Sequence, residues 1–168
     1  MSLSMYQAFI PPAIRALGNL AAVLDKIASH AEARKIDPAV FVGARLFPDM
    51  LPLVKQVQIA SDTVKGAAAR LAGQEPPRFE DNEASFPELQ ARIQKTIDYL
   101  QTFTSEQIDG SEDKAITLAM RSGELHFKGQ DYLTTYVLPN LYFHVTTAYA
   151  IARSNGVELG KRDFLGQV

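Results

Sequence analysis

The sequence predicts a mainly α-helical protein, a four-helix bundle with one short β-hairpin between its third and fourth long helices. Four long segments repeat apolar residues at spacings of three and four, the period of a helix with one buried face. The segment 116–128 instead alternates apolar and polar residues, which is typical of strands. Helices with one-sided apolar faces bury them best against one another. We expect residues 1–168 to form a single domain, because this length suffices for one hydrophobic core.

The composition argues against several classes of protein. Seventeen Lys and Arg residues against nineteen Asp and Glu give a net charge of -2 without a basic block, so no nucleic-acid partner is expected. The absence of cysteine excludes disulfides, cysteine-ligated zinc and thiol nucleophiles. No stretch approaches the roughly 20 apolar residues of a membrane span, and residues 1–30 lack the pattern of a signal peptide. We therefore expect a soluble, cytoplasmic protein with no membrane association.

The first long helix is expected over about residues 4–31, with Ser4 as its N-cap. Pro11 and Pro12 each remove an amide donor inside this helix, which predicts a kink or a split after two turns. A short helix should follow over about residues 37–46, where an Asp-Pro pair supplies a cap and a first residue that has no intrahelical donor to lose.

The second long helix should span about residues 49–72, and the glycine after it can adopt the left-handed conformation that ends many helices. Residues 74–84 carry two prolines and several acids without a period, which predicts a surface loop. The third long helix should begin with a capping box, in which the Ser85 hydroxyl meets the amide of Glu88 while the Glu88 carboxylate reaches back.

The hairpin is expected at residues 116–128, with a turn at 121–123. It must pack on the helices or on another chain, because an isolated hairpin is marginal in water. The last long helix should run over residues 131–155 and bend near Pro139, and the apolar residues of the tail 157–168 should lie against the bundle. Either the connection before the second long helix or the one that holds the hairpin could carry the chain across the bundle.

His144 is the candidate functional residue. It lies in the run 140–151, NLYFHVTTAYAI, at a position that helical spacing places on the core face. A buried imidazole needs hydrogen-bond partners, and Gln56 or Gln58, which flank the apolar face of the second long helix, could supply one. Tyr149 lies on a flank of the same face, so the sequence allows a small ligand pocket formed by these four residues.

Three interpretations of His144 stay open: a hydrogen-bonded core residue, a contact to a ligand, or a metal ligand. The spacing favours the first. A metal site on one helix needs a second ligand three or four residues away, but position 148 is alanine and position 141 is leucine. The other histidines, His30 and His126, lie on different elements. The sequence therefore predicts no cofactor and disfavours a divalent metal.

Two parts of the sequence resemble a bacterial family of domains of unknown function. They are Leu46-x-Pro48-Asp49-Met50-x-Pro52-Leu53-x-x-Gln56-Val57-Gln58-Ile59-Ala60-x-Asp62 and Pro139-Asn140-x-x-Phe143-His144-Val145-Thr146-Thr147-Ala148-Tyr149, continued by Asn155-Gly156-x-x-x-Gly160-Lys161-Arg162-Asp163-Phe164-Leu165-Gly166. That family is similar to the DinB/YfiT-like superfamily of proposed metalloenzymes. The resemblance implies a four-helix bundle with a long crossover, assembled as a homodimer.

The same resemblance implies a metal site made by one histidine of the second helix and two from an H-x-x-x-H motif on the last, and some members use thiol cofactors. His144 matches one of these places, but Ala148 stands where its partner would be and the second helix has no histidine. We therefore expect a soluble bundle that lacks the complete three-histidine site, with small-ligand binding as the role still open. The alternative is a divergent metal- or thiol-dependent transferase or hydrolase with a site around His144.

Overall fold

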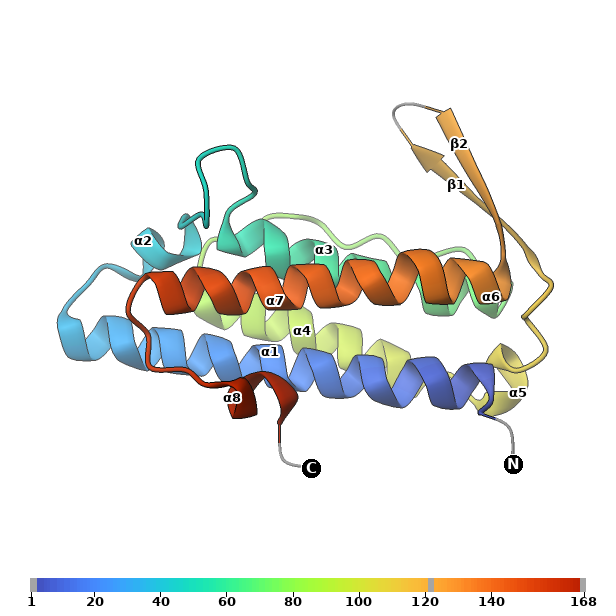
Figure 1. Ribbon diagram of the computed structural model, residues 1–168, viewed down its shortest axis with the longest axis horizontal. Helices are drawn as coiled ribbons and strands as arrows, with labels where there is room; N and C mark the ends of the chain where they lie inside the picture. Colours follow the sequence, from blue (N-terminus) through green and yellow to red (C-terminus); the bar gives the residue numbers. More distant parts are fainter. Residues whose placement is uncertain (1–2, 121–122, 167–168) are drawn as a thin grey trace.

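The computed structural model describes residues 3–120 and 123–166, and within these ranges four long helices form a bundle (Figure 1). They are α1 (Met5–Arg34), α3 (Leu53–Leu71), α4 (Phe86–Gln101) and α7 (Leu138–Ser154). Both α1 and α3 pack against α4 and against α7, so the order around the bundle is α1, α4, α3, α7. Because a hydrophobic cluster joins all four helices, the predicted bundle is confirmed.

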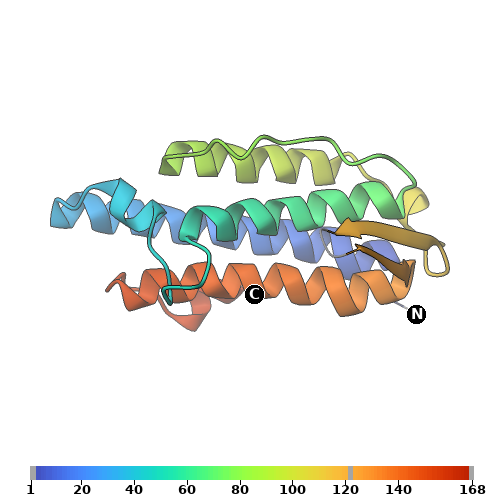
Figure 2. The same ribbon diagram turned by 90° about the horizontal axis from the view of Figure 1, so that it is seen from above.

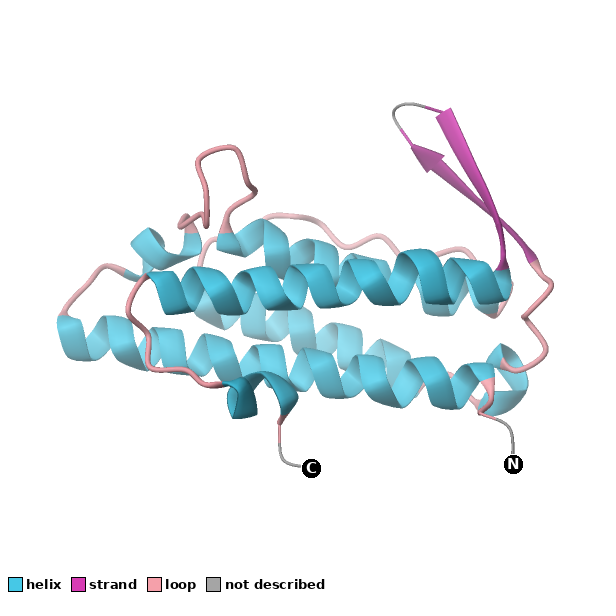
Figure 3. Cartoon of the chain, viewed as in Figure 1, coloured by secondary structure: helices cyan, strands magenta, loops and turns pink. Residues whose placement is uncertain are grey.

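Shorter elements connect and extend these helices (Figure 3). They are α2 (Pro38–Val42), α5 (Ser105–Ile108), α6 (Gly129–Asp131), the π-helix η1 (Tyr132–Val137), α8 (Lys161–Leu165), β1 (Ala115–Met120) and β2 (Gly123–Lys128). The strands pair antiparallel, with Leu118 opposite Leu125. The predicted hairpin is therefore confirmed, although residues 121 and 122 of its predicted turn lie outside the described residues.

The course of the chain differs from the prediction. Helices α3 and α4 run in the same direction, so the segment 72–85 has to travel the length of the bundle between them, as Figures 1 and 2 both show. An extended residue covers about 3.3 Å and a helical residue about 1.5 Å, so this short segment is long enough to return along α4. Both connections that the sequence suggested join diagonal helices, α1 with α3 and α4 with α7, so each carries the chain across the bundle. The connection that runs along the length of the bundle, segment 72–85, was not predicted.

Predicted caps begin the first and third long helices. The Ser4 hydroxyl accepts a hydrogen bond from the amide of Gln7 at 3.3 Å, and the Ser85 hydroxyl accepts one from the amide of Glu88 at 3.5 Å. The Glu88 carboxylate reaches back as expected, but to the amide of Ala84, at 2.7 Å. These side chains satisfy amides that have no partner within the helix.

Two predicted helix boundaries were wrong by several residues. Helix α2 ends at Val42 rather than near residue 46, and α3 begins at Leu53 rather than at Asp49. Two prolines account for the longer loop, since each pushes the residue before it away from helical geometry. The second of them, Pro52, is extended and stands directly before α3.

Internal prolines are accommodated without interrupting the first and last long helices. Helix α1 is continuous through Pro11 and Pro12, so the predicted split does not occur. Before Pro139 the chain widens into η1, where the amide of Leu138 donates to the carbonyl of Leu133. Since Pro139 has no amide to donate to the preceding turn, the expected bend takes the form of this wider π-helical turn.

The C-terminal segment lies along α1. Asn19 donates from Nδ2 to the carbonyl oxygen of Phe164 at 2.9 Å, and Lys26 Nζ lies 2.7 Å from Asp163 Oδ1. The prediction that the tail packs on the bundle is confirmed as far as residue 166. In the part of the chain that the structure describes, no helix combines the length and apolar character that crossing a membrane requires.

Gly129 occupies a position where a side chain has no room. A β-carbon there would overlap the backbone carbonyl oxygen of Ser111, which cannot rotate away. We expect Gly129→Ala to lower the free energy of unfolding by about 1–3 kcal/mol, as overpacking does, measured by urea denaturation. Gly18→Ala is the matched control: Gly18 is exposed in α1 with open space around it, so alanine should stabilise by about 0.5–1 kcal/mol. An unchanged Gly129→Ala protein would show that the two segments can separate freely.

Candidate functional site

Among the described residues, polar pairs recur along the apolar interface between α3 and α7. The α3 members are seven residues apart, which is close to two helical turns, so they lie on one side of the helix. Their partners on the α7 side follow in the opposite order, because the two helices run antiparallel. We call these residues the polar seam; the pairs are Gln56 with His144, Thr63 with Asn140, and Arg70 with Tyr132.

His144 is held in one orientation by the first of these pairs. Its Nδ1 lies 2.7 Å from Oε1 of Gln56, and Nε2 of Gln56 donates to the carbonyl oxygen of Leu51 at 2.8 Å. The Leu51 carbonyl assigns the amide orientation of Gln56, so the group that faces His144 is an oxygen acceptor. Nδ1 of His144 therefore carries the proton, and Nε2 is the ring nitrogen with the free lone pair.

The surroundings of His144 favour a neutral imidazole. The side chain is 7% exposed, and burial lowers the pKa of His144 below its ordinary value. Phe143 meets the imidazole edge to face, with ring centres 5.2 Å apart, and is itself 56% exposed. Within the described residues Nε2 has no hydrogen-bond partner, and it is not among the side-chain atoms that are fully shielded from solvent without a partner.

The other two predicted pocket residues lie in different surroundings. Gln58 is buried, but its Nε2 donates to Oε2 of Glu83 at 2.7 Å, on the side of α3 that faces the crossing segment. Tyr149 packs against Phe164 of α8, with ring centres 6.3 Å apart. The structure thus brings together His144 and Gln56 and separates Gln58 and Tyr149 from them.

The residues around His144 do not fit the metal site that the superfamily resemblance implies. The oxygen of Gln56 is engaged by His144, and Ala148 offers no donor atom. Across residues 3–120 and 123–166, no group of three or more His, Cys, Asp or Glu side chains could hold a metal ion. A single imidazole beside an engaged amide falls short of the ligand set that such a metal requires.

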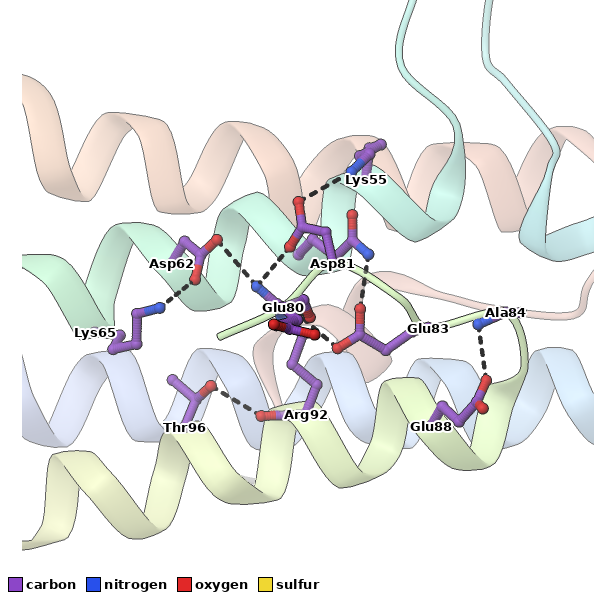
Figure 4. A network of polar contacts seen from close by, with 11 residues as sticks. Lys55, Asp62, Lys65, Glu80, Asp81, Glu83, Ala84, Glu88, Arg92 and Thr96 are labelled. Carbon is purple, nitrogen blue, oxygen red and sulfur yellow. Dashed lines mark hydrogen bonds and ion pairs between the residues drawn. The ribbon is translucent and has the colours of Figure 1, made fainter. Parts of the chain in front are cut away.

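A second polar centre surrounds Arg92 of α4, which the apolar pattern alone did not reveal. The side chain is 3% exposed. Its Nη1 lies 2.9 Å from Glu83 Oε1, and its Nη2 lies 3.0 Å from Asp62 Oδ2 and 3.0 Å from Asp81 Oδ1 (Figure 4). The Nη2 contacts are ion pairs by distance and lack the angles of hydrogen bonds. Nη1 also donates to the carbonyl oxygen of Glu80 at 3.0 Å, so Arg92 ties the crossing segment to α3 and α4.

Two lysines extend this Arg92 cluster. Lys55 Nζ lies 3.0 Å from Asp81 Oδ2, and Lys65 Nζ lies 2.6 Å from Asp62 Oδ1. Lys65 also stands over the ring of Phe79 in the crossing segment, 4.1 Å from the ring centre, which is a favourable cation–π distance. Each carboxylate of the cluster therefore pairs with at least one cation. The predicted surface loop, residues 74–84, is held against α3 and α4 by these contacts.

The charges of the cluster favour the ionised forms of Asp81, Glu83 and Arg92. Burial alone would raise the pKa of Asp81, but the hydrogen bond from Lys55 and the charge of Arg92 outweigh it and lower that pKa. Burial would likewise raise the pKa of Glu83, and hydrogen bonds from Arg92 and Gln58 lower it. For Arg92, burial opposes the charged form, yet Glu83 and the neighbouring aspartates raise its pKa. These three pKa shifts all favour the ionised forms, as expected for a structural connection.

Comparison with known proteins places this geometry in a family. No curated protein matches the chain. The chain is similar to a crystal structure of a DinB family member protein from Shewanella denitrificans, with 37% identity, a TM-score of 0.89, and coverage of 97% of this chain and 92% of that chain. This likeness confirms the resemblance predicted from the sequence. A family model described as Domain of unknown function (DUF1993) matches residues 5–165, and the chain therefore belongs to the DUF1993 family.

Proposed function

We propose that this protein binds a small, largely apolar molecule beside His144, and that Nε2 of the neutral imidazole accepts a hydrogen bond from it. The observation that supports this function is the hydrogen bond of Nδ1 to Gln56. It leaves the lone pair of Nε2 without a donor among the described residues. Nε2 is not fully shielded from solvent, so a ligand O–H or N–H group can take the place of water at this acceptor.

The neighbouring residues suggest the shape of the ligand. Phe143 lies edge-on to the imidazole and is 56% exposed. An exposed aromatic ring beside a polar acceptor suits a flat molecule with one donor group, since apolar area supplies affinity and a single polar group sets orientation. Phenol is the simplest probe of that kind.

The test uses phenol and toluene, which share a ring but differ in the hydroxyl donor. Long-range ¹H–¹⁵N NMR spectra of the histidine rings should show Nδ1–H at His144, and phenol should shift its Nε2 resonance. Toluene should bind about fivefold more weakly, which corresponds to one hydrogen bond, and His144→Phe should remove the preference for phenol. Equal affinity for the two probes, or an Nε2–H tautomer, would contradict the proposal.

A further inference from the structure

Arg70, near the C-terminal end of α3, has no acidic partner among the described residues. None of the ion pairs in the described part of the chain includes it. Its Nη1 lies 3.4 Å from the hydroxyl oxygen of Tyr132, at the long end of the hydrogen-bond range. Arg92, on the next helix, contacts the carboxylates of Asp62, Asp81 and Glu83. Within the described residues, no carboxylate therefore lies at ion-pair distance from Arg70, although Asp62 and Glu75 border the same hollows.

Helix α3 leaves space for this guanidinium. A β-carbon at Gly66, one turn before Arg70, would come 2.5 Å from Nη1, so the guanidinium rests directly against the helix backbone. Glycine inside a helix is less favourable than alanine by about 1 kcal/mol. The position of Arg70 thus depends on Gly66, a residue with low helix propensity.

The guanidinium stands between a smaller and a larger hollow beneath the hairpin. The smaller, of about 220 Å³, lies between α3, η1 and β1, and Leu118 and Tyr136 line it. The larger, of about 420 Å³, lies between residues 73–76 and β1. Arg70 and Ala119 border both. The hairpin rises from this end of the bundle (Figure 1), and residues of β1 line both hollows.

The smaller hollow combines apolar walls with this guanidinium charge. Tyr132 and Tyr136, both from η1, stack with ring centres 5.9 Å apart, and π-helical turns are frequent at functional sites. Ile59 and Met120 add apolar surface. Asp62 also lines the hollow, but its carboxylate is shared by Arg92 and Lys65. The polar groups of Thr63 and Asn140 bond to each other.

We propose that this hollow binds a small organic carboxylate, whose charged group pairs with Arg70 while its compact apolar body lies against Leu118 and Tyr136. A guanidinium offers two parallel N–H donors that match a carboxylate. The volume of about 220 Å³ is below that of sites for drug-sized ligands, so the ligand is small. Arg70 lies fourteen residues from Gln56, about 21 Å along α3, so this site is separate from the one at His144.

The experiment measures binding of sodium benzoate, inorganic phosphate and benzyl alcohol by ¹H–¹⁵N NMR titration of the full chain. Benzoate should shift the amides of β1 and η1, and phosphate and benzyl alcohol should each bind about tenfold more weakly, because one lacks the apolar body and the other the charge. Arg70→Met should weaken benzoate binding about tenfold, whereas Arg153→Met, which removes an exposed arginine of α7, should leave it unchanged.

Gly66→Ala gives a second test that keeps the charge. It should displace the guanidinium without weakening the helix and should weaken benzoate binding severalfold, while the protein melts at the same or a higher temperature. The proposal is overturned if benzoate shifts no resonance of β1 or η1, if Arg70→Met binds benzoate as tightly as the wild type, or if phosphate binds as tightly as benzoate. Loss of phenol binding at His144 would leave these outcomes unaffected.

Discussion

Replacing Arg92 by methionine should lower the free energy of unfolding by about 2–4 kcal/mol. The substitution leaves Asp62, Asp81 and Glu83 near one another without their shared cation, and breaking a buried ion pair costs about 3–5 kcal/mol. The range is reduced because Asp62 and Asp81 have side chains that are 40% and 43% exposed, so water screens part of the repulsion. Differential scanning calorimetry should show a melting temperature lower by about 10 °C.

Arg78→Met is the matched control for this substitution, since Arg78 is an exposed arginine on the same crossing segment. Its effect should stay within about 0.5 kcal/mol, as for most surface substitutions. Hydrogen exchange should distinguish the two variants further: amides of residues 74–84 should exchange faster in Arg92→Met and at the wild-type rate in Arg78→Met. If the two variants have the same melting temperature, the ion pairs of Arg92 do not stabilise the fold.

Substituting His144 by alanine should cost about 1–3 kcal/mol at pH 7.5, because it leaves a cavity and an unpaired Gln56 amide oxygen. This cost should shrink as the pH falls. Burial lowers the pKa of His144 in the folded protein, whereas the unfolded chain titrates near the ordinary value of about 6.5. Between that value and the lower folded pKa, the unfolded state binds more protons than the folded state. The contribution of neutral His144 to stability is therefore fully present above about pH 6.5 and is lost below it, by up to about 1.4 kcal/mol per pH unit.

Urea unfolding at pH 7.5, 6.5 and 5.5 measures this dependence in the wild type and in His144→Ala. The difference in unfolding free energy between the two proteins should narrow toward pH 5.5. His126→Ala is the control, because His126 is exposed on β2, with a side chain that is 68% accessible, so its removal should leave neither a cavity nor a buried unpaired group. A constant difference for His144→Ala would show that His144 titrates alike in both states.

The helical pattern was sufficient to predict the bundle and to offer Gln56 or Gln58 as the partner of His144, without choosing between them. Apolar spacing placed His144 on the core face, and the antiparallel approach of α7 to α3 then brought it to Gln56. Gln58 was an equally good candidate on spacing alone, but it lies about 200° from Gln56 around the helix and therefore faces the crossing segment. Which flank meets α7 depends on the packing of the bundle, which the spacing within one helix does not determine.

The course of segment 72–85 and the Arg92 cluster were harder to predict. Periodicity gives no helix direction, so the parallel course of α3 and α4 could not be inferred. A local signal for Arg92 did exist: it lies three residues after Leu89 and four before Thr96, both on the buried face of α4. Its partners come from α3 and from acids of a loop that the composition described only as solvated. The homodimer, the cytoplasmic location and the enzymatic alternative stay predictions.

The parallel course of α3 and α4 also has a consequence for the order in which the protein folds. An antiparallel helix pair can form as a local hairpin, but α4 can dock beside α3 only after the segment 72–85 has returned along the bundle. We expect the contacts of this segment to form late, because closing it costs chain entropy before the ion pairs stabilise it. The ion pairs of Arg92 should therefore be largely absent from the transition state, so that losing them accelerates unfolding more than it slows folding. We therefore expect Arg92 to affect the lifetime of the native bundle more than its rate of formation.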